Sequence, residues 1–319
     1  MQRVLIFILC LSFSLGAYGQ NNELLGTYKI AFIGQDNESA KYKAVFAGIE
    51  SEAKRLCSEY SIEVEVIQLS PQNSGLENPQ SAALAKTFLE DIEGIIISPV
   101  SDEPLDTLLG LSKAHGKEIV YIENSVTSVA PFLFIKPDEV EAGRLAGRAL
   151  LKKLPTGGRV AILSKVNPDQ TFQNRLLGVK KVLGYKGIET IVYTEPNYQS
   201  ALSAIKQAMQ ADVNHYIKGW VFLEDWPLQG MPEFSWPQKS LPVVAIQTSP
   251  TAYLAYDSGY VESFVLHPYF EWGTISANSI IKKLFKGTVP QSDRIKLKPI
   301  SVDWQNIALY RNYWKAWLE

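Results

Sequence analysis

The chain has 319 residues and a formal net charge of −2, and 46% of its residues are hydrophobic against 20% that are charged. This balance is typical of a folded globular protein and excludes a disordered chain. The near-neutral charge leaves no basic surface, so we expect no nucleic-acid partner, and the length suffices for two domains with cores of their own.

The N-terminus has the pattern of a secretory signal. Arg3 gives a positive start, and the apolar stretch 4–15 is too short to span a bilayer as a helix. Ala17 and Gly19 are small residues at the two positions that a signal peptidase reads. We therefore expect residues 1–19 to be a signal peptide that is cleaved near Gly19.

Removal of this signal would leave Cys57 as the one cysteine of the mature chain, because Cys10 lies inside the signal. No intrachain disulfide can then form, so the fold must be stable on its core alone. Cys57 lies in a stretch of helical periodicity, where we expect a buried thiol and not a reactive one.

Short apolar runs alternate with amphipathic helical stretches along the whole chain. The strand candidates are 28–34, 62–69, 94–100, 118–124, 159–165, 189–195, 220–225 and 242–248, and the helical stretches include 39–60, 138–153, 171–183 and 199–210. Strand–helix–strand alternation predicts parallel sheets that are covered by helices on both faces. The sequence therefore predicts an α/β fold of the doubly wound type.

The alternation occurs twice, which favours two similar lobes. In each half a helix with a central glycine, Gly48 or Gly178, follows a strand and a polar loop. The segment 125–135 lacks helical periodicity and is interpreted as a crossing between lobes. At the C-terminal end, 294–303 is expected to be extended and 304–318 to form a closing helix.

Polar side chains gather where the predicted strands end. They fall at 35–39, 98–102, 123–124, 165–169, 195, 224–226 and 247–249. In an open parallel sheet, ligands bind in the crevice outside the carboxyl ends of the strands. Two lobes whose strand ends face one another would line a cleft with groups suited to hydroxyls and with aromatic faces suited to a sugar ring.

The competing interpretation is that these residues only form turns and cap helices. It is strong for Ser39, Asp138 and Ser249, which immediately precede helical stretches, and weaker for the acids that directly follow apolar strands, Glu123, Glu224 and Asp225. Trp220 is expected in the core, and Trp226, beyond its strand, as a wall of the cleft. Arg175 lies inside a helix from which it could reach the cleft, although a surface position stays open.

Seven segments, in order, resemble one known family. They are "KIAFIG…YKAVFAGIESEAKR", "IEGIIISPVSDEPL", "KEIVYIEN", "FIKPDEVEAGRLAGRALLKKL", "NRLLGVKKVL", "GWVFLED" and "PVVAIQT". The chain is similar to the periplasmic sugar-binding proteins of the ribose/galactose type, the type I solute-binding proteins of ABC transporters. The resemblance implies two doubly wound parallel-sheet lobes joined by a multi-strand hinge. We expect an N-terminal lobe of 27–134 plus 267–295 and a C-terminal lobe of 135–266 plus 296–319.

The resemblance also implies ligand-binding positions. They fall on Lys41, Tyr42, Ser98, Glu123, Asn124, Arg175, Glu224 and Gln247, to which the strand-end argument adds Trp226. The scaffold is closer to the family pattern than the pocket is, because Glu123 and Asn124 keep an acid but lose a guanidinium. Lys41 with Arg175 could admit an acidic sugar, whereas Glu123 and Glu224 would equally accept hydroxyls or an amine.

The expected function is a periplasmic receptor that captures a small polar solute, with a carbohydrate as the leading class, for an ABC permease. The alternative is a ligand-sensing partner of a membrane histidine kinase, motivated by an aromatic tail that contains Trp314 and Trp317. An enzyme is not expected, because His115, His215 and His267 lack metal-ligand spacing and no nucleophile or phosphate-binding motif is present. No cofactor and no metal are expected.

Overall fold

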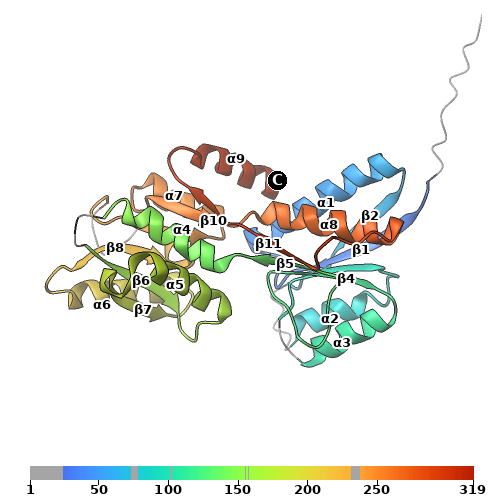
Figure 1. Cartoon of the computed structure of the whole chain (residues 1–319), viewed down its shortest axis with the longest axis horizontal. Coiled ribbons are helices and arrows are strands. Elements are labelled where there is room, and N and C mark those ends of the chain that lie inside the picture. Colours follow the sequence, from blue (N-terminus) through green and yellow to red (C-terminus); the bar gives the residue numbers. More distant parts are fainter. Residues whose placement is uncertain (1–23, 73–77, 101–102, 155, 157, 231–237) are drawn as a thin grey trace, which may run out of the picture.

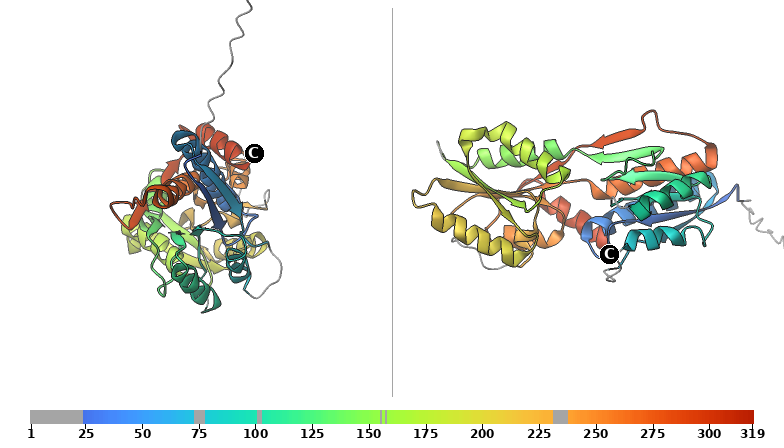
Figure 2. Two further views of the ribbon diagram at one scale, coloured as in Figure 1. Left: turned by 90° about the vertical axis from the view of Figure 1, so that its right-hand side faces the viewer. Right: turned by 90° about the horizontal axis from the view of Figure 1, so that it is seen from below.

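The computed structural model describes residues 24–72, 78–100, 103–154, 156, 158–230 and 238–319. These residues form two α/β lobes that lie side by side along the long axis of the molecule (Figures 1 and 2). Each lobe is built on a six-stranded sheet. The expected fold class, two doubly wound lobes, is confirmed. The predicted signal peptide lies outside the described residues.

The first sheet has the strand order β11-β5-β4-β3-β1-β2, and its paired strands are all parallel. Its strands are β1 (Thr27–Ile33), β2 (Glu63–Gln68), β3 (Gly94–Ile97), β4 (Glu118–Ile122), β5 (Leu133–Pro137) and β11 (Arg294–Leu297). Helices α1 (Ala40–Tyr60) and α8 (Tyr269–Lys286) cover one face, and α2 (Pro79–Lys86) and α3 (Glu103–Ala114) cover the other (Figure 1).

The second sheet has the order β12-β10-β9-β8-β6-β7, in which β12 is antiparallel to β10. Its strands are β6 (Arg159–Lys165), β7 (Ile188–Thr194), β8 (Ile217–Phe222), β9 (Val243–Gln247), β10 (Ser263–Leu266) and β12 (Ile300–Val302). The helices are α4 (Glu139–Leu151), α5 (Gln170–Leu183), α6 (Tyr198–Ala211) and α7 (Tyr253–Asp257), with short 3-10 turns at Tyr185–Gly187, Trp226–Leu228 and Pro250–Ala252.

Burial on both faces explains why the strands are apolar without alternation. In β1, Ile30 and Phe32 belong to the core beneath α1 and α8, whereas Ala31 and Ile33 belong to the core on the opposite face. All four side chains are fully buried. Successive side chains of a strand point to opposite faces, so a central parallel strand must be apolar at every position. Trp220 in β8 is also fully buried, as expected.

Within the described residues the chain passes between the two sheets three times, after β5, after β10 and after β11. The segment 125–135 is not the crossing itself, because its last residues already pair in the first sheet as part of β5. β5 and β11 stay in that sheet to Pro137 and Leu297, slightly past the expected lobe boundaries at 134 and 295. The division into lobes stays a prediction.

The expected closing helix is α9 (Ile307–Leu318), and it packs on elements of both lobes. Trp314 is buried with its ring 6.0 Å from Tyr269, and Trp317 stacks on Phe270 of α8 at 5.8 Å. On the second lobe, Arg311 pairs with Asp257 of α7 at 2.9 Å. Most of the aromatic tail is therefore engaged with its own chain.

Two further observations concern individual expectations. Cys57 is half-buried and not fully buried, because it lies at the edge of the buried face of α1. Across the described part of the chain, each helix is too short or too polar to span a membrane.

Candidate functional site

A cavity of about 200 Å³ lies between the strand ends of the two sheets. Both lobes and the segments that connect them contribute to its wall. The lining residues are Gln35, Lys41, Glu123, Asn124, Lys165, Asp169, Thr171, Phe172, Arg175, Glu224, Thr248, His267, Tyr269 and Trp272. This is the place where a doubly wound sheet binds its ligands.

The wall from the first lobe centres on an ion pair between Lys41 and Glu123. Lys41 lies in the first turn of α1, which Ser39 caps through its side chain, and Glu123 follows β4 directly with a positive φ of 62°. The Lys41 ammonium donates to Glu123 Oε1 at 2.8 Å and to Oε2 at 3.0 Å. The Tyr42 hydroxyl donates to Glu123 Oε2 at 2.8 Å and contacts Ser98 Oγ at 3.1 Å.

These contacts fix the charge state of the pair. Burial alone would raise the pKa of Glu123, but the Lys41 ammonium and the Tyr42 hydroxyl hold that pKa below its usual value. Burial would lower the pKa of Lys41, and the Glu123 carboxylate raises it well above the ordinary value instead. Burial also raises the pKa of Tyr42, so its hydroxyl keeps its proton. The wall presents a fixed cation and a fixed anion.

The wall from the second lobe centres on Arg175 of α5. Its Nε donates to Glu139 Oε2 at 2.6 Å and its Nη2 to Glu139 Oε1 at 3.1 Å, a two-point contact that holds the guanidinium plane. Its Nη1 donates to the carbonyl oxygen of Leu223 at 2.8 Å and to Glu224 Oε2 at 3.3 Å. Arg175 is therefore a buried residue that reaches the cleft, and the surface alternative is excluded.

Glu139 was not found from the sequence. It is the first residue of α4, where an acid looks like an ordinary favourable charge at a helix N-terminus. Its side chain is buried, and Oε2 also accepts a hydrogen bond from His267 Nε2 at 3.1 Å. Burial would raise the pKa of Glu139, but Arg175 and His267 hold it well below its usual value.

A second ion pair, which was not among the expected ligand residues, lies on the same wall. Lys165 at the end of β6 donates to Asp169 Oδ2 at 2.7 Å, and its ammonium lies 4.9 Å from the centre of the Phe172 ring. The strand-end pattern did include both residues, but no family position singled them out. Together with Tyr269 and Trp272 from the start of α8, Phe172 gives the cavity aromatic faces.

Five of the nine expected ligand residues line the cavity, and these are Lys41, Glu123, Asn124, Arg175 and Glu224. Tyr42 and Ser98 are buried behind Glu123 and support its carboxylate.

The remaining two expected residues are placed outside the lining. Trp226 is buried in the 3-10 turn Trp226–Leu228, and its ring packs 5.7 Å from that of Phe172, which does line the cavity. Gln247 is the last residue of β9 and points into the core, where its Nε2 donates to the carbonyl oxygen of Ser249 at 2.9 Å. Thr248, one residue further, lines the cavity in its place.

Asp225 has a supporting role, although it directly follows the acid that faces the cleft. It is fully buried and accepts hydrogen bonds from the backbone N–H groups of Thr248 and Ser249, both at 3.0 Å, and from Thr248 Oγ1 at 2.6 Å. Burial raises its pKa to about 6. Asp225 thus ties the ends of β8 and β9 together and positions Thr248.

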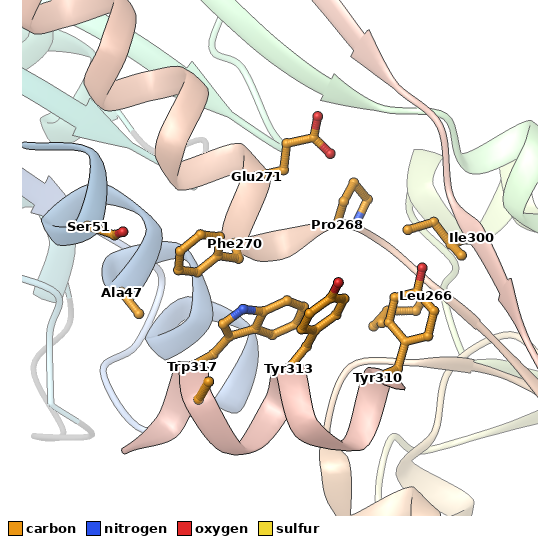
Figure 3. Close-up of a pocket in the computed structure, with 11 residues that line it drawn as sticks. Ala47, Ser51, Leu266, Pro268, Phe270, Glu271, Ile300, Tyr310, Tyr313 and Trp317 are labelled. Atoms are coloured by element: carbon orange, nitrogen blue, oxygen red, sulfur yellow. The ribbon is translucent and has the colours of Figure 1, made fainter. Parts of the chain in front are cut away.

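A larger cavity, of about 650 Å³, lies beneath α9 between the lobes. Figure 3 shows the rings of Tyr313 and Trp317 projecting from α9 toward Phe270 of α8, while the carboxylate of Glu271 points away from them. Among the described residues that line this cavity, Glu271 alone is charged. Its wall offers few partners for a polyhydroxy solute, so we take the smaller, polar cavity as the candidate site.

The electrostatic balance of the polar cavity defines what it can bind. Each of its three lining cations contacts a carboxylate: Lys41 with Glu123, Lys165 with Asp169, and Arg175 with Glu139 and Glu224. Such pairs offer donors and acceptors side by side, which suits vicinal hydroxyls. Among the described residues no cluster of acids, histidines and cysteines could hold a metal ion.

Two α/β lobes with a polar cavity between their strand ends define a solute-binding protein of the two-lobed type. The chain belongs to the periplasmic binding protein family, because the model of the periplasmic binding protein domain matches residues 27–288. The resemblance noted in the sequence is confirmed, and the family consists of binding proteins, in agreement with the expectation that the chain is not an enzyme.

Solved structures share this fold at low sequence identity. An arabinose-binding protein from Geobacillus stearothermophilus has a TM-score of 0.76 at 16% identity, with 89% of this chain and 99% of that chain covered. A periplasmic ribose ABC transporter protein from Conexibacter woesei has a TM-score of 0.75 at 16% identity, covering 93% and 99%. A myo-inositol-binding protein from Caulobacter, bound to myo-inositol, has a TM-score of 0.69 at 17% identity, covering 88% and 95%. A comparison with curated protein sequences finds no match.

Proposed function

We propose that the chain is a secreted periplasmic receptor that captures a sugar or a sugar derivative between its lobes and delivers it to an ABC importer. The observation that carries the proposal is the set of paired charges at the facing strand ends, above all Lys41 with Glu123 and Arg175 with Glu224. Each pair can donate to one ligand oxygen and accept from a neighbouring hydroxyl. The rings of Phe172 and Trp272 supply apolar faces for the C–H groups of a sugar ring.

The family and the solved structures support the solute class. The structures that share the fold include proteins described as binding arabinose and myo-inositol, which are small, uncharged and rich in hydroxyls. Closure of the lobes about the three connecting segments would bury such a ligand and present one joint surface to a permease. The signal-like pattern at 1–19 supports export of the mature protein to the periplasm.

The sensory alternative is not favoured. It depended on the aromatic tail as a contact for a kinase, but Trp314 of that tail is buried against Tyr269. The tail is accounted for by packing within the chain.

Calorimetry of the purified protein against a panel of pentoses, hexoses and inositols tests the proposal, and at least one of them should bind. Arg175→Ala should then abolish binding, whereas Arg144→Ala, an exposed arginine of α4 that pairs with Glu141, should leave it unchanged. Because loss of Arg175 leaves the Glu139 carboxylate buried without its partner, folding of the variant is checked by circular dichroism. Glu224→Gln, at a half-buried position, is the milder second variant and should weaken binding at least tenfold. Full affinity in both cavity variants would contradict the site.

A further inference from the structure

Glu139 occupies a distinctive position between the connecting segments and the cavity. It is the first residue of α4, directly after the chain leaves the first sheet at Pro137. His267 contacts Oε2 of Glu139 through its Nε2. It lies between β10 and α8, where the chain returns to the first lobe. The carboxylate of Glu139 therefore joins Arg175 of the ligand cavity to two of the three segments that connect the lobes.

Glu139 also occupies one edge of the Arg175 guanidinium. The two parallel hydrogen bonds, from Nε and Nη2, are the geometry in which an arginine would otherwise hold the carboxylate of a ligand. Nη1 is already directed to Leu223 and Glu224. Glu139 thus fills this edge from behind the cavity wall and leaves it closed to the carboxylate of a ligand.

The charge count points the same way. The described lining of the cavity carries three cations, Lys41, Lys165 and Arg175, and three carboxylates, Glu123, Asp169 and Glu224. Glu139, directly behind Arg175, adds a negative charge in excess of this balance. In a buried site such an excess disfavours an anion, because the interaction is poorly screened.

Glu139 also holds the ring of His267. An ionised carboxylate only accepts hydrogen bonds, so the proton between the two groups is carried by His267 Nε2. The other ring nitrogen, Nδ1, is buried and has no hydrogen-bond partner among the described residues. His267 itself lines the cavity, so Glu139 fixes the orientation of a second lining residue besides Arg175.

We propose that Glu139 is the positioning residue that makes this cavity select uncharged polyhydroxy solutes over acidic sugars. It does so by occupying the two-point edge of Arg175 and by placing a negative charge directly behind the cavity wall. This inference rests on the proposed function, because it concerns the ligand class of the same cavity. Glu139 itself is not a lining residue and acts through Arg175 and His267.

The test compares a neutral sugar that binds with its uronic acid, for instance galactose with galacturonate, by calorimetry at pH 7. Wild type should bind the neutral form at least tenfold more tightly. Glu139→Gln keeps the size of the side chain and removes its charge, so the ratio of the two Kd values should shift toward the acid by about tenfold or more. Glu139→Asp, which keeps the charge, should retain a preference for the neutral form.

The matched control is Glu141→Gln, the same charge change on the same helix at a residue that pairs with Arg144 outside the cavity. In this control the ratio of the Kd values for the neutral sugar and the uronic acid should equal that of wild type. Nitrogen-15 NMR of the His267 ring gives a second readout, because the amide of Gln at position 139 can donate to Nε2 and move the ring proton to Nδ1.

Two results would overturn the inference: a wild type that binds the uronate as tightly as the neutral sugar, or a folded Glu139→Gln that binds with an unchanged ratio. The first needs no variant, so the inference is testable even if Glu139→Gln does not fold. A wild type that binds no sugar of either kind would instead overturn the proposed function itself.

Discussion

Substitution of Gly143 by alanine should separate α4 from α5 and displace the ligand arginine. A Cβ atom on Gly143 would lie 1.9 Å from the carbonyl oxygen of Arg175 and 3.0 Å from Cα of Gly178. The oxygen belongs to the backbone of α5 and cannot rotate away, so the helices must move apart by more than an ångström to reach ordinary contact.

The expected cost exceeds the gain from the better helix former. Overpacking against a fixed neighbour costs about 3 kcal/mol, at the upper end of the usual range, whereas alanine gains about 1 kcal/mol over glycine in a helix interior. We expect Gly143→Ala to lower the free energy of unfolding by about 2 kcal/mol. The hydrogen bond from Arg175 to the carbonyl oxygen of Leu223, at 2.8 Å, would be stretched beyond its range, so ligand affinity should fall at least tenfold.

Urea unfolding and calorimetry with the bound sugar measure both effects. Gly147→Ala is the matched control, because its Cβ would lie 3.1 Å from Cβ of Val182, where a shift of a few tenths of an ångström suffices. The control should keep its ligand affinity and lose at most about 0.5 kcal/mol. Wild-type stability and affinity in Gly143→Ala would refute the argument that close packing of these two helices places Arg175.

Two further predictions concern other parts of the molecule. Trp314→Ala should lower the free energy of unfolding by about 3–5 kcal/mol in urea titrations, because its ring is fully buried and packs on Tyr269. A loss below about 1 kcal/mol would show that α9 is not part of the folded core. Burial would raise the pKa of Glu123, but Lys41 and Tyr42 lower it overall in the folded protein. The ionised carboxylate therefore stabilises the fold at pH values above the unfolded pKa of about 4.3. This stabilisation is lost as the pH falls through the lower pKa of the folded state. Glu123→Gln should therefore lose less Tm than wild type when both are scanned from pH 5 to pH 2, and parallel curves would contradict the assigned pair.

The parallel sheets and the two lobes could be anticipated because local patterns indicate them. The run 30–33 is apolar at every position, as a parallel strand covered on both faces requires, and such runs recur between helical stretches. The polar strand ends follow from the same topology. Glu123 was therefore predicted as a cleft residue from its strand end, whereas Lys41 was predicted through the family resemblance alone.

The contacts that join distant segments could not be anticipated. Glu139 and His267 are 128 residues apart, and no local pattern indicates that one carboxylate oxygen serves both His267 and Arg175. For Trp226 a local pattern was present, but it indicated the wrong position. It follows its strand as a cleft residue would, but it begins a 3-10 turn in which its ring is buried against Phe172.

A crystal structure of the protein with its bound sugar tests the central claim most directly. The account predicts density for the sugar in the cavity between the lobes, with ligand oxygens within hydrogen-bond distance of Lys41, Glu123 and Arg175. Density for the sugar beneath α9, against Tyr313 and Trp317, with the polar cavity empty, would contradict it.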